Sequence, residues 1–208
     1  MVKGLIFDLD GVIVNTEHNH FLAWKRIANR FSISFDEEAN EQLKGLNRKD
    51  SLLKLLAMDD VKLESNHFEE LLQVKNKFYL DSLRDLSTKD ILPGVLELLQ
   101  EAQRKGVLLS VGSSSKNAPF ILDKLGLTDY FEIIIDGNGV KTPKPHPEVF
   151  LNAAKGMELL PADCVVFEDA SSGVEAAKAG GFKVIAVGNP YIQDLADEYF
   201  SDLTEFKF

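Results

Sequence analysis

Two aspartates separated by a single residue follow an apolar run close to the N-terminus. The run is residues 2–7, and Asp8 and Asp10 come after it. Such a run is typical of a strand buried on both faces of a parallel sheet, and ligands bind at the carboxyl ends of these strands. An aspartyl nucleophile, a second aspartate for proton transfer and a hard divalent ion would account for the pair. A solvated turn is the alternative for this motif taken alone.

Five consecutive polar residues follow the second predicted strand, Val107–Val111. They are Ser113, Ser114, Ser115, Lys116 and Asn117. A helix pattern comes next, over Pro119–Leu125, and the free N–H groups of a helix N-terminus bind phosphate. The segment therefore predicts a phosphate site, with simple helix capping by Ser115 or Asn117 as the alternative.

A lysine lies among prolines in the loop that follows the third predicted strand, Ile133–Ile135. The loop Lys141–Pro147 has a proline at every second position from Pro143 onward, and these prolines restrict the backbone around Lys144. A lysine held beside carboxylates neutralises the charge of a phosphoryl group. On its own, the Lys-Pro pair would indicate only a surface turn.

Two consecutive acids, Glu168 and Asp169, follow the fourth predicted strand, Cys164–Phe167. They lie near Asp8 and Asp10 if this strand neighbours the first. A cluster of carboxylates with few other charges is the hard-oxygen environment that Mg²⁺ prefers. Helix capping by Asp169 or Ser171 is the alternative, but it explains the Glu-Asp pair less well.

The elements that position these residues alternate along the chain between short apolar strands and helix patterns. A fifth strand is predicted at Val184–Val187. This alternation is typical of an α/β fold with a doubly wound, Rossmann-like parallel sheet. Residues 15–86 break the alternation, because they contain helical apolar stripes and no strand pattern. One of these stripes comprises Phe68, Leu71, Leu72 and Lys75.

Two domains follow from this organisation. We expect an α/β core domain of residues 1–14 and 87–208, and a helical cap domain of residues 15–86 inserted after the first strand. An insert at this place would stand over the carboxyl ends of the strands and could act as a lid.

The composition excludes several classes of protein. The chain has 208 residues, 45% of them hydrophobic, which is enough for a full core. Its net charge of −10 argues against nucleic acid and anionic membranes as partners. The single cysteine, Cys164, gives no disulfide framework, and no run is long enough to span a membrane. We therefore expect a cytoplasmic enzyme.

Four of these features match, in order, the motifs of the haloacid dehalogenase superfamily of phosphotransferases. They are Phe7–Val12, the serine after the second strand, Lys144-Pro145 and Glu168-Asp169. The sequence resembles this family over nearly its whole length. Four motifs in the correct order make the resemblance specific.

The resemblance implies a role for each residue of the constellation. Asp8 would be the nucleophile, which forms an aspartyl-phosphate, and Asp10 the general acid/base. Ser113 and Lys144 would hold the transferring phosphoryl group. A magnesium ion would bind Asp8, the Asp10 carbonyl, Asp169 and, more loosely, Glu168.

Three segments resemble the β-phosphoglucomutase branch of the superfamily: His20–Trp24, Asn40–Leu52 and Ser115–Asn117. This resemblance implies a sugar phosphate as substrate and a second phosphate site, with Arg48 as its main cation. The substrate-binding residues that it implies are His20, Trp24, Gly45, Leu46, Asn47, Arg48, Ser51, Ser114, Ser115, Lys116 and Asn117.

The residues around Arg48 support a phosphate site independently of the resemblance. Asn47 is a suitable N-cap for a helix over Arg48–Ala57, so Arg48 and Lys49 fall in its first turn. Two cations at the positive end of a helix dipole are unfavourable, and a bound phosphate reverses that effect. An exposed basic turn is the alternative, chiefly for Lys49.

The expected reaction is the interconversion of β-D-glucose 1-phosphate and D-glucose 6-phosphate, through an aspartyl-phosphate enzyme and glucose 1,6-bisphosphate. Two alternatives stay open: a magnesium-dependent sugar-phosphate phosphatase of the same superfamily, and a non-catalytic sugar-phosphate sensor. We expect the protein to act on small sugar phosphates as a monomer.

Overall fold

The computed structural model describes residues 2–208 and divides the chain into two compact units. One unit comprises the chain up to Asn15 together with Leu86–Phe208, and the other comprises Thr16–Asp85. The chain leaves the first unit shortly after its first strand and returns to it before the second. We call them the α/β unit and the helical unit.

The α/β unit is built on a six-stranded sheet in which every pair of neighbouring strands is parallel. The strand order is β3-β2-β1-β4-β5-β6. The strands are β1 (Gly4–Phe7), β2 (Leu108–Gly112), β3 (Ile133–Ile135), β4 (Cys164–Glu168), β5 (Lys183–Val187) and β6 (Glu198–Phe200). The predicted doubly wound α/β fold is confirmed, and β1 lies between β2 and β4, so the polar residues that follow these three strands lie at one edge of the sheet.

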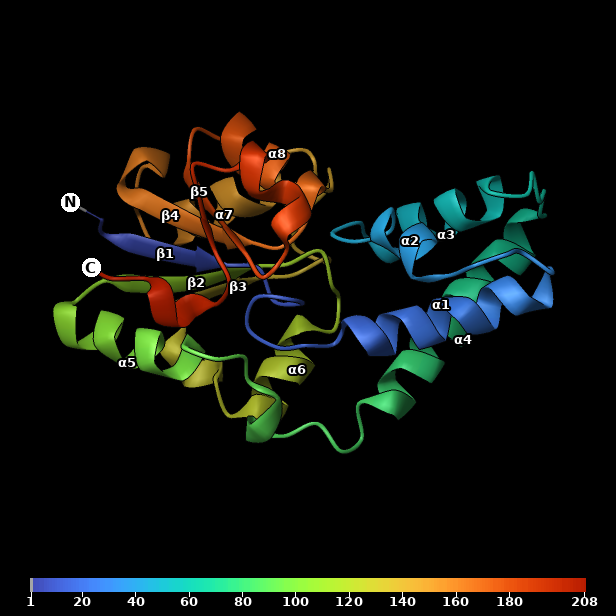
Figure 1. Ribbon diagram of the computed structural model, residues 1–208, viewed down its shortest axis with the longest axis horizontal. Coiled ribbons are helices and arrows are strands. Elements are labelled where there is room, and N and C mark those ends of the chain that lie inside the picture. Colours follow the sequence, from blue (N-terminus) through green and yellow to red (C-terminus); the bar gives the residue numbers. More distant parts are fainter. Residues whose placement is uncertain (1) are drawn as a thin grey trace. The chain divides into compact units, whose positions relative to one another are not determined.

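Helices cover both faces of this sheet (Figure 1). On one side lie α5 (Val95–Lys105) and α6 (Ala118–Leu125), and on the other lie α7 (Glu148–Gly156) and α8 (Ser171–Ala179). The apolar faces of α7 and α8 pack on the middle of the sheet, where Ile6, Phe150 and Val166 are fully buried. This packing anchors β1 and β4, whose last residues precede Asp8 and Asp169.

The helical unit contains four helices and, within residues 16–85, no strand. They are α1 (Glu17–Arg30), α2 (Glu37–Glu41), α3 (Arg48–Ala57) and α4 (Ser65–Ser82). Its core includes the buried side chains of Trp24, Ile27, Leu52 and Leu71. The predicted helix over Arg48–Ala57 is confirmed residue for residue, and its N-cap is Asn47, whose Oδ1 accepts a hydrogen bond from the N–H of Asp50 (3.0 Å).

The structure adds one strand that was not expected. The short strand β6 pairs with β5 at the edge of the sheet, and none of its three residues is buried. A three-residue strand of sequence Glu-Tyr-Phe is too short to contain an apolar run that would predict it. Its pairing with β5 is its main link to the sheet. Cys164, expected in the core, is buried in β4.

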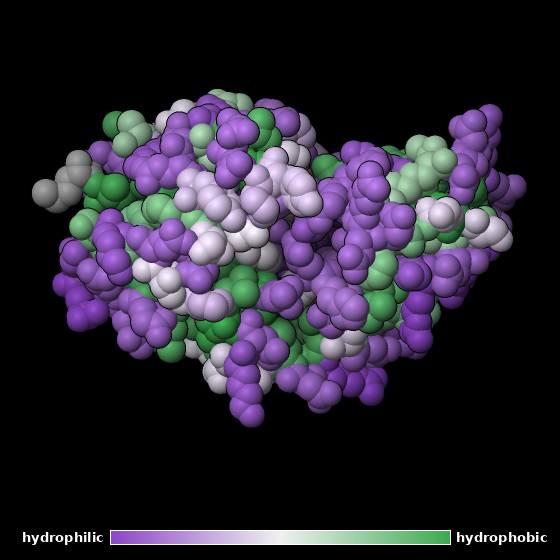
Figure 2. Space-filling view, viewed as in Figure 1, coloured by the Kyte–Doolittle hydropathy of each residue, from purple (hydrophilic) through white to green (hydrophobic). Residues whose placement is uncertain are grey.

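Polar side chains cover most of the surface that faces the viewer in Figure 2, and apolar side chains appear there in small groups. Within residues 2–208, no helix combines the length and the apolar composition that crossing a bilayer requires.

Candidate active site

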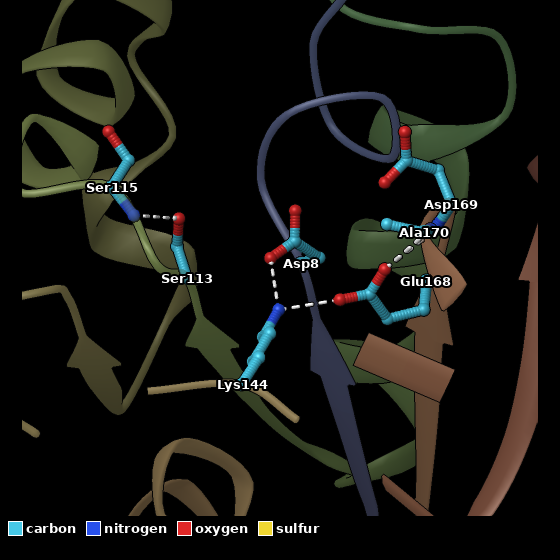
Figure 3. Close-up of polar contacts among 7 residues, drawn as sticks. All are labelled: Asp8, Ser113, Ser115, Lys144, Glu168, Asp169 and Ala170. Carbon is cyan, nitrogen blue, oxygen red and sulfur yellow. Dashed lines mark hydrogen bonds and ion pairs between the residues drawn. The ribbon is translucent and has the colours of Figure 1, made fainter. Parts of the chain in front are cut away.

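A buried lysine joins two carboxylates at the carboxyl edge of the sheet. Lys144 Nζ donates to Asp8 Oδ1 (2.6 Å) and to Glu168 Oε1 (2.5 Å). Asp8 follows β1, Glu168 ends the neighbouring strand β4, and Lys144 comes from the proline-rich loop before α7. Figure 3 shows Ser113 on one side of Asp8, with Glu168 and Asp169 on the other. The structure therefore brings together four of the predicted motifs.

Burial controls the charges of this cluster. Removal from water raises the pKa of the Asp8 carboxyl to about 7, although the positive charge of Lys144 opposes the shift. Glu168 and Asp10 add to it because they repel a second negative charge. Burial acts to lower the pKa of Lys144, but the two carboxylates outweigh burial and raise it. Lys144 therefore keeps its charge, and a further positive charge beside Asp8 would favour the ionised form of that carboxyl.

Glu168 is fully buried and accepts hydrogen bonds on both of its oxygens. Besides the bond from Lys144, its Oε2 accepts from the N–H groups of Asp169 (2.8 Å) and Ala170 (2.9 Å). The carboxylate fits against the first turn of α8, where a Cβ on Gly173 would overlap it. Three donors and this close contact fix the orientation of Glu168, and through it the position of the Lys144 ammonium.

Asp169 lies on the other side of the same turn. Its carboxylate packs against Gly11, in the loop that follows Asp10, so closely that a Cβ at Gly11 would overlap it. The Asp169 carbonyl accepts a hydrogen bond from Asn189 Nδ2 (2.8 Å), which ties the turn after β4 to the loop after β5. The sequence offered no signal for Asn189, because the contact depends on the juxtaposition of two strand ends.

The donor set suits a magnesium ion. Asp8 and Asp169 offer carboxylate oxygens and Asp10 offers its backbone carbonyl after two adjacent strands, and Mg²⁺ binds through one or two carboxylates together with water and phosphate. In the part of the chain that the structure describes, no three His, Cys, Asp or Glu side chains already converge as a metal site. The raised pKa of Asp8 marks a carboxylate that an additional cation would stabilise in its charged form.

The five polar residues after β2 form a tight turn. The N–H of Ser113 donates to the carbonyl of Ile135 (2.9 Å), which ties the turn to β3. Ser113 Oγ accepts from the N–H of Ser115 (3.0 Å), and Ser115 Oγ accepts from the N–H of Asn117 (3.2 Å). Asn117 is the N-cap residue of α6, so the predicted placement of this segment at a helix N-terminus is confirmed. We call residues 113–117 the serine turn.

The predicted residues of the helical unit fall in two sets, and the first lies in α3 and in the loop before it. Arg48 and Lys49 occupy the first turn of α3, and Ser51 Oγ donates to the carbonyl of Asn47 (2.9 Å). Gly45 adopts a left-handed conformation (φ 70°) in the preceding loop, which also contains Leu46. The loop thus turns sharply just before Asn47, the N-cap of α3.

The second set, His20 and Trp24, lies on α1, and Lys75 and Tyr79 of α4 contact it. His20 Nδ1 is 2.8 Å from Lys75 Nζ, and the His20 ring lies against Tyr79 with ring centroids 4.1 Å apart. Lys75 is 2% exposed and its ammonium lies 4.7 Å from the centroids of both Trp24 and Tyr79. Trp24 itself is buried in the core of the unit. Sequence analysis did not predict that Lys75 is buried beside His20, although its position within an apolar helical stripe indicated burial.

One further cation was not anticipated. Lys44, beside Gly45, forms ion pairs with Glu17 (2.8 Å) and Glu41 (2.7 Å). Burial acts to lower its pKa, but the hydrogen bonds to these two carboxylates raise it above its ordinary value. Lys44 therefore remains charged at neutral pH.

The chain is similar to known proteins over almost its whole length. The family model of haloacid dehalogenase-like hydrolases matches residues 5–187. The chain is 40% identical to a β-phosphoglucomutase of Bacillus subtilis (strain 168), covering 98% of this chain and 92% of the relative. It is 31% identical to a fructose-1-phosphate phosphatase of Escherichia coli (strain K12), covering 88% of this chain and 95% of that one. A crystal structure of a β-phosphoglucomutase from Clostridium difficile matches with a TM-score of 0.95 and 35% identity, covering 100% of this chain and 94% of that one.

Proposed function

Because the chain belongs to the family of haloacid dehalogenase-like hydrolases, we propose that it is a phosphosugar mutase of the β-phosphoglucomutase type. It interconverts β-D-glucose 1-phosphate and D-glucose 6-phosphate. The observation that carries phosphoryl transfer is the buried lysine that joins Asp8 to Glu168. The choice of a mutase is supported by the relatives, since the match to a β-phosphoglucomutase has higher identity than the match to a phosphatase.

The reaction has two halves that use the same groups. A carboxylate oxygen of Asp8 attacks the phosphorus of the bisphosphate, an aspartyl-phosphate forms, and the bond from phosphorus to the sugar oxygen breaks. Asp10 gives its proton to the departing sugar oxygen. In the second half, a hydroxyl of the sugar monophosphate loses its proton to Asp10 while its oxygen attacks the phosphorus. The bond to Asp8 then breaks and the carboxylate is restored.

Charge neutralisation and positioning supply most of the acceleration in phosphoryl transfer. Lys144 stabilises the charge of the transferring group, and Glu168 holds Lys144 in place through its three hydrogen bonds. Ser113 binds the same group from the β2 side. When bound to Asp8, the Asp10 carbonyl and Asp169, with Glu168 as a weaker ligand, Mg²⁺ supplies a Lewis acid that neutralises phosphate charge.

A mutase needs a second phosphate site, because its bisphosphate intermediate must present either end to Asp8. In this proposal residues 15–86 form a cap, and Arg48 binds the phosphate that is not being transferred, together with Ser114, Ser115, Lys116 and Asn117 of the serine turn. Gly45, Leu46 and Asn47 shape the loop before Arg48, and Ser51 lies in the same helix as Arg48. His20 assists Asp10, and Trp24 lies one helical turn further along α1, buried in the core of the helical unit. The enzyme works as a monomer in the cytoplasm.

A coupled assay tests the proposal. The purified protein is given β-D-glucose 1-phosphate, Mg²⁺ and a catalytic amount of glucose 1,6-bisphosphate, and glucose 6-phosphate and free phosphate are followed together. A mutase produces glucose 6-phosphate with little free phosphate, and its turnover falls when the bisphosphate is left out. The variant Asp8→Asn should lose this activity while it keeps the fold. Release of free phosphate in proportion to substrate consumed would identify a phosphatase instead.

A further inference from the structure

The turn after β3 lies directly against the serine turn. Gly137, two residues beyond β3, donates its N–H to the carbonyl of Ser115 (3.2 Å), and Ser113 donates its own N–H to the carbonyl of Ile135 (2.9 Å). The two turns are therefore joined by hydrogen bonds in both directions. Neither Gly137 nor its neighbours carries a charged group that would bind a phosphate, so any contribution from this turn comes through the residues that it supports.

The approach at Gly137 leaves no room for a side chain. A Cβ built on Gly137 would overlap the carbonyl oxygen of Ser114 and would lie 3.0 Å from Lys116 Cγ and 3.2 Å from Lys116 N. Ser114 and Lys116 both lie within the serine turn. Its backbone is restricted by the hydrogen bonds from Ser115 N–H to Ser113 Oγ and from Asn117 N–H to Ser115 Oγ. The Lys116 side chain thus passes close to Gly137, and it can take this path because Gly137 has no Cβ.

The turn after β3 is itself held rigidly. Asp136 Oδ1 accepts hydrogen bonds from the N–H groups of Asn138 (2.8 Å) and Gly139 (3.1 Å), and its Oδ2 accepts from Asn138 Nδ2 (2.9 Å). A backbone held by its own aspartate in this way has few alternative conformations. Gly137 therefore presents a stiff surface to the serine turn, and an added methyl group would displace Ser114 and Lys116 rather than the turn after β3.

We propose that Gly137 is a positioning residue for the second phosphate site, and that it sets the place of Ser114 and the path of Lys116. This inference rests on the proposed function, because it assigns those residues to the phosphate that is not being transferred. It predicts that a side chain at 137 weakens binding of the sugar phosphate while it spares the chemistry at Asp8, because the three atoms nearest to the added Cβ belong to Ser114 and Lys116.

Two variants in the same turn provide the test. Gly137→Ala should raise the KM for β-D-glucose 1-phosphate and the Kd for glucose 6-phosphate, measured by calorimetry, at least tenfold. Phosphorylation of Asp8 by acetyl phosphate, which has no second phosphate, should change less than twofold. Gly139→Ala is the matched control, because a Cβ there would make ordinary contacts with Ile135 Cγ2 (3.4 Å) and the Asp136 carbonyl (3.5 Å). This control should match the wild type in all three measurements.

A double variant distinguishes positioning from a general loss of structure. Lys116→Ala removes the contact with Lys116 Cγ and leaves the contact with the Ser114 carbonyl, so Gly137→Ala should cost less in the Lys116→Ala background than in the wild type while part of its cost remains. Strictly additive losses, equal losses with acetyl phosphate and sugar, or a Gly137→Ala variant as active as Gly139→Ala would each overturn the inference. A wild type that binds glucose 6-phosphate but lacks mutase activity would refute the proposed function alone, and the Kd values would still decide the role of Gly137.

Amide hydrogen exchange keeps the inference testable if Gly137→Ala does not fold. In the wild-type protein, glucose 6-phosphate should slow exchange at the amides of Gly137 and Ser115 together, since the two turns then behave as one structure. The amide of Gly139, which Asp136 already holds, should change little. An unchanged Gly137 amide beside a protected Ser115 amide would contradict the proposal.

Discussion

The variant Gly173→Ala would test how strongly the site depends on the exact place of Glu168. Gly173 is the third residue of α8, and a Cβ there would overlap the Glu168 carboxylate. Replacement of glycine by alanine inside a helix ordinarily stabilises it by about 1 kcal/mol. Here the methyl group must push a fully buried carboxylate away from Lys144 and from two N–H groups. Breaking a buried pair costs about 3–5 kcal/mol, so the net loss should be about 2–4 kcal/mol.

Denaturant unfolding followed by circular dichroism measures this loss, and for a chain of this size it corresponds to a Tm lower by roughly 4–16 °C. Mutase turnover should fall as well, because displaced Glu168 no longer holds Lys144. The control compares the double variant Glu168→Ala, Gly173→Ala with the single variant Glu168→Ala. Because the carboxylate is absent from both, the added methyl group should leave the unfolding free energy unchanged or raise it. A single Gly173→Ala variant that is more stable than the wild type would refute the reasoning.

Three further predictions concern single groups. Arg48→Ala should lower mutase turnover by one to two decades, since a charge-assisted bidentate contact contributes about 1.5–3 kcal/mol; equal loss of Asp8 phosphorylation by acetyl phosphate would show a structural role. Ser110→Ala should raise the unfolding free energy by about 1 kcal/mol, because the fully buried hydroxyl of Ser110 has no hydrogen-bond partner among residues 2–208; a less stable variant would contradict this. Asp197 accepts from Lys178 and the N–H of Val184, which hold its pKa below the ordinary value. The stability it contributes is present above the ordinary aspartate pKa and is lost as the pH falls through the lowered one. The stability deficit of Asp197→Asn, measured by unfolding from pH 7 downward, should therefore shrink as the pH falls below the ordinary aspartate pKa. A deficit that stays constant over this acid range would refute that assignment.

Local signals predicted most of the fold and the contents of the site. The cap at Asn47 and the apolar spacing after it define α3 without reference to any other part of the chain. The same holds for β1 and β4, since a strand buried on both faces is an uninterrupted apolar run. The polar residue types after these strands then indicated the chemistry. By contrast, β6 depends on its pairing with β5, which no local pattern encodes.

The contacts inside the site could not be predicted in the same way. Lys144 and Asp8 are far apart in the sequence, and their hydrogen bond depends on strand order, loop path and side-chain rotamer together. The two hydrogen bonds from the turn after β4 to Glu168 require the backbone conformation that precedes α8. The contact of Asn189 with Asp169 depends on the fold, which brings the loop after β5 beside the turn after β4. Sequence spacing names the participants of a site, while tertiary packing decides which atoms meet.

The place of β1 in the middle of the sheet has a consequence for the order in which the protein is made. This strand leaves the ribosome before both of its neighbours, because β2 and β4 follow it by more than 100 and more than 150 residues. The helical unit keeps its contacts within one continuous stretch and can collapse early, whereas pairing between distant segments is slow. A nascent chain therefore carries Asp8 without the assembled Lys144–Glu168 pair until synthesis has passed Glu168. Premature termination anywhere before that point yields a polypeptide with a nucleophile but no assembled site.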